Sequence, residues 1–202
     1  SNNIYAPSGD AAELVINTQA TLDFATSLGD KLAIVNGDVT IEQTTSMDAT
    51  QLAAVMAKMT SVTGDVSYTA DATGVVPTAG FSALTGVATI TMDVNGDVSL
   101  PVLASASTVD IQDNTKVTSV SLPALKTVTT LSNLTFNKAT SLDLSSLERY
   151  ADDLTIDIKS GTVNLDAFVT TTTATNTPES GNDITVNGAD VVVATLITGG
   201  KL

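Results

Sequence analysis

Apolar and polar residues alternate according to one template in four short segments of the second half of the chain. The template is an apolar residue, a polar residue, a leucine, two variable residues and a final apolar residue. The four segments are residues 98–103, 120–125, 142–147 and 163–168. Their central leucines are spaced 22, 22 and 21 residues apart, at Leu100, Leu122, Leu144 and Leu165. A constant period of this size predicts a solenoid, in which each repeat is one coil stacked on the last.

A second series of strand-like segments runs offset from the leucines. It comprises residues 88–90, 109–111, 134–136 and 154–156, with Ile90, Ile111, Phe136 and Ile156 as the equivalent positions. The two series therefore predict two strands in each coil, which build two sheets along the stack. Because successive residues of a strand point to opposite faces, the apolar residues of both sheets would point inward.

The first sixty residues show helical as well as strand patterns. Residues 1–12 form a polar lead-in, and residues 13–17 predict a strand. Apolar residues at helical spacing in 21–28 predict a helix that begins at Thr18 or Thr21 and ends at Gly29. Residues 48–59 predict a second helix with Asp48 near its N-cap, because its apolar residues recur at helical spacing: Leu52, Val55, Met56 and Met59.

A Gly-Asp pair precedes an alternating segment three times, in residues 34–41, 61–68 and 94–100. Glycine tolerates positive φ and aspartate satisfies backbone donors locally. Each copy therefore predicts a turn followed by a strand.

The division of the chain follows from these patterns. Residues 1–202 predict one repeat domain, in which residues 1–30 form a cap and residues 31–168 form the coils. Residues 169–181 are a Thr-rich loop, and residues 182–202 predict two final strands. Because Val191–Ile197 is apolar on both faces and sparsely charged, it predicts an association edge for another chain or domain, with the residues Val191, Val193, Leu196 and Ile197.

Composition excludes several classes of function. The chain has 22 acidic and 8 basic residues, a net charge of −14, so it is a poor partner for nucleic acid or for an anionic membrane surface. No apolar run is long enough to insert into a membrane. Aromatic residues make up 3%, and cysteine and histidine are absent. The core is therefore expected to be built from Val, Leu, Ile, Ala and Thr, without disulfides or thiolate metal sites.

A calcium site is the candidate chemistry of residues 93–97. Asp93, Asn95 and Asp97 have the spacing of oxygen ligands that opens a calcium-binding loop. The sixth and twelfth positions of such a loop, which are glycine and glutamate in the EF-hand, are here Val98 and Ala104. We therefore expect a turn between coils and no cofactor, with Ca²⁺ as the alternative.

Catalysis has weak support in the sequence. Asp152 and Asp153 are adjacent, and Asp110 and Asp113 are close, but acid–base hydrolysis needs two carboxylates that face each other across a cleft. A serine nucleophile needs a base, and the chain has no histidine. We expect no enzymatic activity. The alternative is a polysaccharide-active enzyme on a β-helix scaffold.

At the Gly-Asp-Val segments and the leucine series, residues 14–168 resemble the leucine-rich-repeat-like receptor L domains. The resemblance implies a mainly β fold, a right-handed parallel β-solenoid with short N-terminal capping helices. It also implies binding or structure at a cell exterior. The expected function is a non-catalytic extracellular surface module, adhesive or structural, which associates with protein or glycan and self-associates in a filament or array.

Overall fold

Parallel strands account for most of the regular structure. The computed structural model describes residues 4–7, 12–70, 80–94, 96–112, 116–132, 135–136, 138–148, 154–167, 184–188 and 190–192. This part of the chain is mainly β with two α-helices, and its strand pairings are all parallel. The mainly β class expected from the sequence is therefore confirmed.

The strands form three sheets. The nine-stranded sheet contains β1 (Ile4–Tyr5), β2 (Glu13–Ile16), β3 (Ile34–Val35), β4 (Asp38–Glu42), β5 (Ser61–Val62), β6 (Val66–Thr69), β7 (Gly86–Asp93), β9 (Ser105–Gln112) and β11 (Thr127–Ser132). The five-stranded sheet contains β8 (Val98–Ser99), β10 (Ser119–Ser121), β13 (Ser141–Asp143), β15 (Thr162–Asn164) and β17 (Asp190–Val192). The three-stranded sheet contains β12 (Thr135–Phe136), β14 (Leu154–Ile158) and β16 (Ile184–Asn187).

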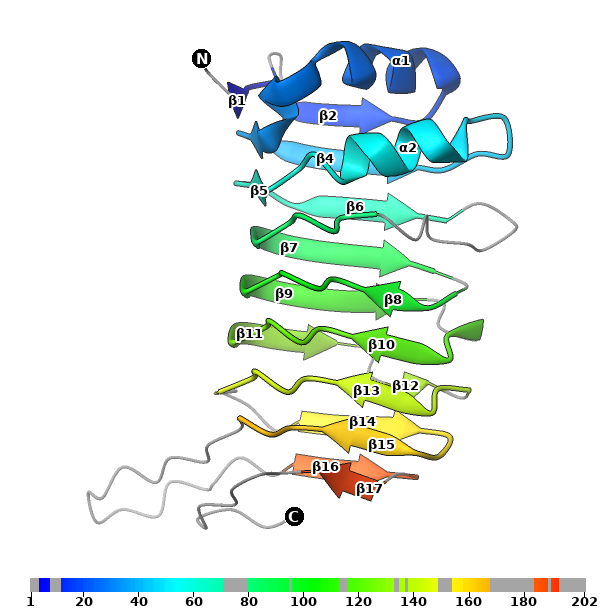
Figure 1. Ribbon diagram of the computed structural model, residues 1–202, viewed down its shortest axis with the longest axis vertical. Coiled ribbons are helices and arrows are strands. Elements are labelled where there is room, and N and C mark those ends of the chain that lie inside the picture. Colours follow the sequence, from blue (N-terminus) through cyan, green and yellow to red (C-terminus); the bar gives the residue numbers. More distant parts are fainter. Residues whose placement is uncertain are drawn as a thin grey trace, which may run out of the picture.

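Successive segments of the chain lie one below another along the long axis of the molecule (Figure 1). From β7 onward the chain runs alternately through the nine- or three-stranded sheet and the five-stranded sheet, with β11 and β12 following each other before β13. We call one such traverse a layer, and we use the same word for each traverse of the chain that precedes β7. Because parallel neighbours need a crossover connection, each layer carries the chain away from one sheet and back to it.

The leucine segments pair with one another at the positions that their sequence period predicted. Val98, Val120, Leu142 and Val163 are register partners on adjacent strands of the five-stranded sheet. The leucine two residues further on in each segment is buried, and in the first three segments its backbone N–H donates to the next layer: Leu100 to Ser121, Leu122 to Asp143 and Leu144 to Asn164. The predicted strands and their spacing are thus confirmed.

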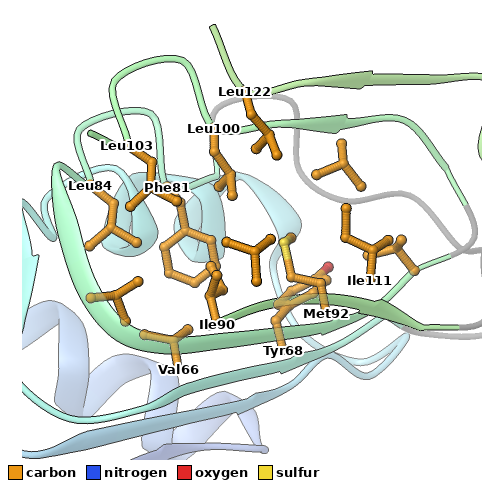
Figure 2. Packing of buried hydrophobic residues seen from close by; sticks show 14 of the residues in the cluster. Val66, Tyr68, Phe81, Leu84, Ile90, Met92, Leu100, Leu103, Ile111 and Leu122 are labelled. Atoms are coloured by element: carbon orange, nitrogen blue, oxygen red, sulfur yellow. The ribbon is translucent and has the colours of Figure 1, made fainter. Parts of the chain in front are cut away.

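The core consists of apolar side chains stacked in register columns. Leu14, Val39, Val66, Ile90, Val109 and Leu131 form one column, and Ile16, Ile41, Tyr68, Met92 and Ile111 form another. Figure 2 shows Ile90 and Met92 facing Leu100 and Phe81 across the interior. Each fully buried aliphatic side chain contributes about 1.5–3 kcal/mol relative to exposure, so these columns are the main source of stability.

Two helices occupy the first two layers. Helix α1 (Gln19–Ser27) begins at Thr18, which shares a capping box with Thr21, and it ends before Gly29, whose φ is +57°. Helix α2 (Ala49–Met56) is capped by Asp48, as predicted. Short 3₁₀ helix η1 (Gly29–Ala33) follows α1. In the described part of the chain no helix has the length and apolarity to span a membrane.

A polar network joins the two helices. The Gln51 side chain accepts a hydrogen bond from Gln19 and donates to Asp23 and Thr26. The hydrogen bonds from Gln51 and Gln19 hold the pKa of Asp23 below its ordinary value. Helix α1 lies at the N-terminal end of the stack, beyond α2 (Figure 1).

The register of the second strand series is wrong in the sequence analysis. Ile90 pairs with Val109 and not with Ile111, whose partner is Met92, and Phe136 pairs with Ile158 and not with Ile156. The series also missed β11, in which Leu131 is the partner of Val109. These residues still face the core where their side chains are described, because a slip of two residues preserves the face of a strand.

One other local expectation differs from the structure. Ile4–Tyr5, predicted to be part of a polar lead-in, forms β1 and pairs with β3.

Each of the three Gly-Asp segments leads into a strand, as expected. Val39 and Val66 are register partners in the nine-stranded sheet, whereas Val98 begins β8 of the five-stranded sheet, at the start of the leucine series. A Gly-Asp pair therefore precedes strands of two different sheets, and we call the turns at the ends of the strands the corners of the stack.

Several expectations fall outside the described residues. They are the Thr-rich loop 169–181 and the segment beyond Val192. The strand expected near residues 183–186 is β16, and Asp190–Val192 is the described part of the last expected strand.

Glycines at the corners of the stack allow close approach between layers. Gly161 has φ +95°, and a Cβ there would lie 2.0 Å from the carbonyl oxygen of Thr140 in the preceding layer. Gly188 has φ +82°, and its Cβ would lie 2.0 Å from the carbonyl oxygen of Ile158. Glycine is required at both positions by conformation and by space.

Leu122→Ala tests the stacked core. Leu122 is 0% exposed, so truncation loses transfer free energy and leaves a cavity, and we expect a loss of roughly 2–5 kcal/mol. The measurement is the free energy of unfolding in urea. Val102→Ala is the control, because Val102 is 39% exposed and should lose far less. If the urea midpoint of unfolding were unchanged in Leu122→Ala, the stacking of the leucine segments in register would be contradicted.

Gly161→Ala tests the close approach at the corners. Gly29→Ala is the matched control, because Gly29 also has positive φ but a Cβ at that position would meet no atom within 4 Å. We expect roughly 1–3 kcal/mol of backbone strain in the control. The loss at Gly161 should be clearly larger, since the methyl group also clashes with Thr140. Thermal unfolding of both variants measures the difference, and equal losses would show that the layers separate freely at this corner.

Candidate functional site

Asp97 joins two adjacent layers. Its Oδ1 accepts hydrogen bonds from the backbone N–H of Thr118 at 2.9 Å, the Thr118 hydroxyl at 2.7 Å and the backbone N–H of Ser119 at 2.8 Å. Thr118 and Ser119 stand at the start of β10, one layer beyond β8. Asp97 thus holds the start of the next strand of the five-stranded sheet.

The hydrogen bonds determine the charge state of Asp97. Partial burial by itself would raise the pKa of this carboxyl, but the bonds from Thr118 and Ser119 outweigh that effect. The pKa of Asp97 therefore lies below its ordinary value of 3.8.

Asp38 has a similar role in the nine-stranded sheet. Its Oδ1 accepts a hydrogen bond from the backbone N–H of Asp65, one layer further along, at 2.8 Å. A Cβ at Gly64 would lie 1.9 Å from this oxygen, so the glycine leaves room for the carboxylate. In both corners the aspartate of a Gly-Asp pair binds the backbone of the neighbouring layer.

The calcium candidate is only partly described. Asp93 is the last residue of β7 and is half-buried, Asp97 has the contacts given above, and Asn95 lies outside the described residues. Within the described ranges, no group of three carboxylate, histidine or cysteine side chains is placed to hold a metal ion. A calcium ion at Asp97 would compete with the three hydrogen bonds of that carboxylate, and the site stays an alternative prediction.

Polar columns cover the outer face of the nine-stranded sheet. They arise because the residues between the buried ones also stack in register. One column is Thr40, Ser67, Thr91 and Asp110, a second is Glu42, Thr69, Asp93 and Gln112, and a third is Thr89, Thr108 and Thr130. Each of these side chains is at least partly exposed. The face therefore presents rows of hydroxyl, carboxyl and amide groups.

The outer face of the five-stranded sheet has the same character. One column is Ser99, Ser121, Asp143 and Asn164, and the other is Ser119, Ser141, Thr162 and Asp190. Asp143 and Asn164 each accept a hydrogen bond from the backbone N–H two residues further on, which fixes their side chains. Sequence reasoning missed both sets of columns as sites, although the polar residues of the alternating pattern were their signal.

Exposed apolar side chains lie at the N-terminal end. Phe24 of α1 and Ile4 of β1 are each 50% exposed, and the ring of Tyr5 contacts that of Phe24 edge to face, with centroids 6.3 Å apart. In contrast, the aromatic side chains of Tyr68 and Phe81 are fully buried. The sequence analysis missed these side chains because it assigned Ile4 and Tyr5 to a polar lead-in.

The predicted association edge is described only at its start. Val191 lies in β17, which is the last strand of the five-stranded sheet within the described residues and pairs with β15. The other predicted members of the edge, Val193, Leu196 and Ile197, lie outside the described residues. Their role as an edge stays a prediction.

The carboxylates considered for catalysis are not brought together by the described structure. Asp110 lies in the outer column and accepts a hydrogen bond from the side chain of Gln112 at 2.8 Å. Asp113, Asp152, Asp153 and Arg149 lie outside the described residues.

Comparisons with known proteins add no family to this description. No protein-family model, curated protein or solved structure matches the chain.

The three hydrogen bonds that Asp97 accepts predict a pH-dependent contribution of this side chain to the stability of the fold. Asp97→Ala removes all three hydrogen bonds and should cost about 1 kcal/mol at neutral pH, similar to the loss of a helix N-cap. Because the folded pKa is lowered, the contribution is complete above pH 3.8 and is lost as the pH falls through the folded pKa. The measurement is the free energy of unfolding of both proteins as a function of pH.

The difference in the free energy of unfolding between the unmodified protein and Asp97→Ala should be constant from neutral pH to about pH 3.8, and it should become smaller at lower pH. The other carboxylates titrate in both proteins, so the difference isolates Asp97. If this difference in the free energy of unfolding grew on acidification, the stabilising role of the ionised Asp97 side chain would be contradicted.

Proposed function

We propose that this chain is a non-catalytic extracellular module of a cell surface, adhesive or structural, that acts by association with protein or glycan. The observation that supports this function is the set of polar register columns on both sheets. Adjacent strands lie about 4.8 Å apart, so the columns repeat the same hydrogen-bonding groups over a long face. Such a face suits contact with an extended partner that has repeating polar groups.

The proposed fold is a right-handed, closed β-solenoid of the leucine-rich-repeat-like, receptor L-domain-like kind. It is supported by the parallel pairings and by the leucine period, which agrees with the register of β8, β10, β13 and β15. In such a fold each layer contacts only its neighbours, so the length of the binding face follows from the number of repeats.

Self-association is the second part of the proposal. The segment Val191–Ile197 is apolar and continues from β17, and an apolar edge strand is a template for another chain. The occupant would be a neighbouring subunit or an adjoining domain, as in a surface filament or array. The net charge of −14 opposes self-association at low salt, so salt should strengthen it by screening.

The proposed function involves no chemical turnover. Two carboxylates that were candidates for chemistry, Asp97 and Asp110, accept hydrogen bonds from neighbouring residues of the fold. These contacts support structural roles for both side chains.

Sedimentation velocity tests the association. We expect concentration-dependent oligomers of the full chain at roughly 0.15 M salt, where the Debye length is about 8 Å, and larger oligomers at higher salt. Val193→Lys combined with Leu196→Lys places two charges in the proposed edge and should return the chain to a monomer. Removal of residues 182–202 should have the same effect.

Val102→Lys is the matched control, because it adds a charge at an exposed apolar residue away from the edge and should leave association unchanged. A full chain that is strictly monomeric and equally soluble with and without residues 182–202 would refute the association edge.

A further inference from the structure

Two asparagine–glycine pairs lie wholly within the described residues, at 36–37 and 187–188. In such a pair the backbone nitrogen of glycine can reach the side-chain carbonyl carbon of asparagine, because glycine has no side chain to restrict the approach. Whether the reaction proceeds depends on how firmly the fold holds the two residues.

Asn36 and Gly37 are held from the layers on both sides. The backbone N–H of Asn36 donates to the carbonyl of Tyr5 at 2.8 Å in the preceding layer. In the following layer, the Thr63 hydroxyl donates to Oδ1 of Asn36 at 3.0 Å and Gly64 N–H donates to the carbonyl of Gly37 at 3.2 Å. Both residues would have to break these contacts to rotate into a reactive geometry.

Within the described residues, Asn187 and Gly188 are held from one side, by the preceding layer. Asn187 is the exposed last residue of β16, and β16 is the final strand of its sheet within the described residues. The Asn187 Nδ2 donates to Oδ1 of Asp157, its register partner on β14. Gly188 has φ +82° and lies against the carbonyl of Ile158, again in the preceding layer.

We propose that Asn187 is a site of spontaneous hydrolytic deamidation and that the fold protects Asn36 from the same reaction. Deamidation at Asn187 needs no partner and no association, so it is independent of the function proposed above. The only co-reactant is water.

The reaction proceeds in two steps. The nitrogen of Gly188 loses its proton and forms a bond to the side-chain carbonyl carbon of Asn187, and the bond from that carbon to the amide nitrogen breaks, so that ammonia leaves and a succinimide remains. Water then adds to one of the two imide carbonyls, and the ring opens to aspartate or isoaspartate. The net change is the conversion of an amide and water into a carboxylic acid and ammonia.

The product changes the pairing of the last described layer. A carboxylate at position 187 cannot donate to Asp157, and two negative charges would then stand opposite each other on adjacent strands, which is destabilising. The reaction therefore weakens the attachment of β16 to β14. Deamidation converts a hydrogen bond between layers into a repulsion.

Peptide mapping by mass spectrometry tests the site. The full chain is incubated in its native state at mildly alkaline pH, and conversion of each asparagine–glycine pair is followed over time. We expect Asn187 to convert several-fold faster than Asn36. The same chain in denaturant is the control, and there the two pairs should convert at similar rates, because the protection at Asn36 comes from the fold. Native conversion of Asn36 at a rate equal to or above that of Asn187, or no native conversion of Asn187, would overturn the proposal.

Hydrogen exchange tests the consequence. Asn187→Asp supplies the product without the reaction, and we expect it to lose protection of the β16 amides relative to the unmodified chain at neutral pH. Protection should return when the pH falls into the range in which carboxylates protonate. Asn187→Gln is the control that retains an amide donor and should retain more protection. Equal protection in Asn187→Asp and the unmodified chain would refute the proposed weakening of the last layer.

Discussion

The in-register stacking of buried aliphatic side chains is the constraint on which the rest of this structure depends. Each buried residue of a layer lies above an equivalent residue of the next, as Val39, Val66 and Ile90 do. This arrangement restricts the register, since a slip of one residue would place polar side chains in the core, whereas a slip of two residues keeps the same face buried. It also fixes the exterior, because the residues between the buried ones are forced into polar columns of the same register.

The corners show how the layers are held where the sheets end. Glycine at Gly161 lets the backbone approach a carbonyl of the previous layer, and Asp97 accepts donors from the next layer. The Asp97 carboxylate satisfies the backbone N–H groups of Thr118 and Ser119, and leaving such groups unpaired would be costly. A layer between two described layers has contacts on both sides, whereas the described residues give the layer of β16 contacts with the preceding layer alone. Asn36 and Asn187 differ for this reason.

Charge has little part in holding the fold together. The ion pair Lys126–Glu148 has an N–O distance of 3.9 Å and both side chains are largely exposed, so its contribution is small. The acidic groups instead cap corners, as Asp38 and Asp97 do, or stand in the outer columns, as Asp110 and Asp143 do. The surface therefore presents hydrogen-bonding groups together with a net negative charge, which opposes contact with other acidic chains.

The sequence by itself determined the mainly β class, the leucine strands and both helices. Periods of two and of 3.6 residues, and the caps at Thr18 and Asp48, depend only on local backbone geometry. The sequence also placed Asp97 at a turn. It could not determine the register of the second sheet, because a shift of two residues leaves the same face of a strand buried, and so Ile111 and Ile156 were matched to the wrong partners. Nor could it place Ile4 and Tyr5, whose strand has two residues and exists because β3 lies beside it. Only the tertiary structure decided which layers Asp97 connects, which polar residues share a column and which asparagine–glycine pair is held from both sides. Those properties depend on contacts between residues far apart in the sequence, such as Asp97 with Thr118, 21 positions apart, and Asn187 with Asp157, 30 positions apart, and local backbone preferences do not encode such contacts.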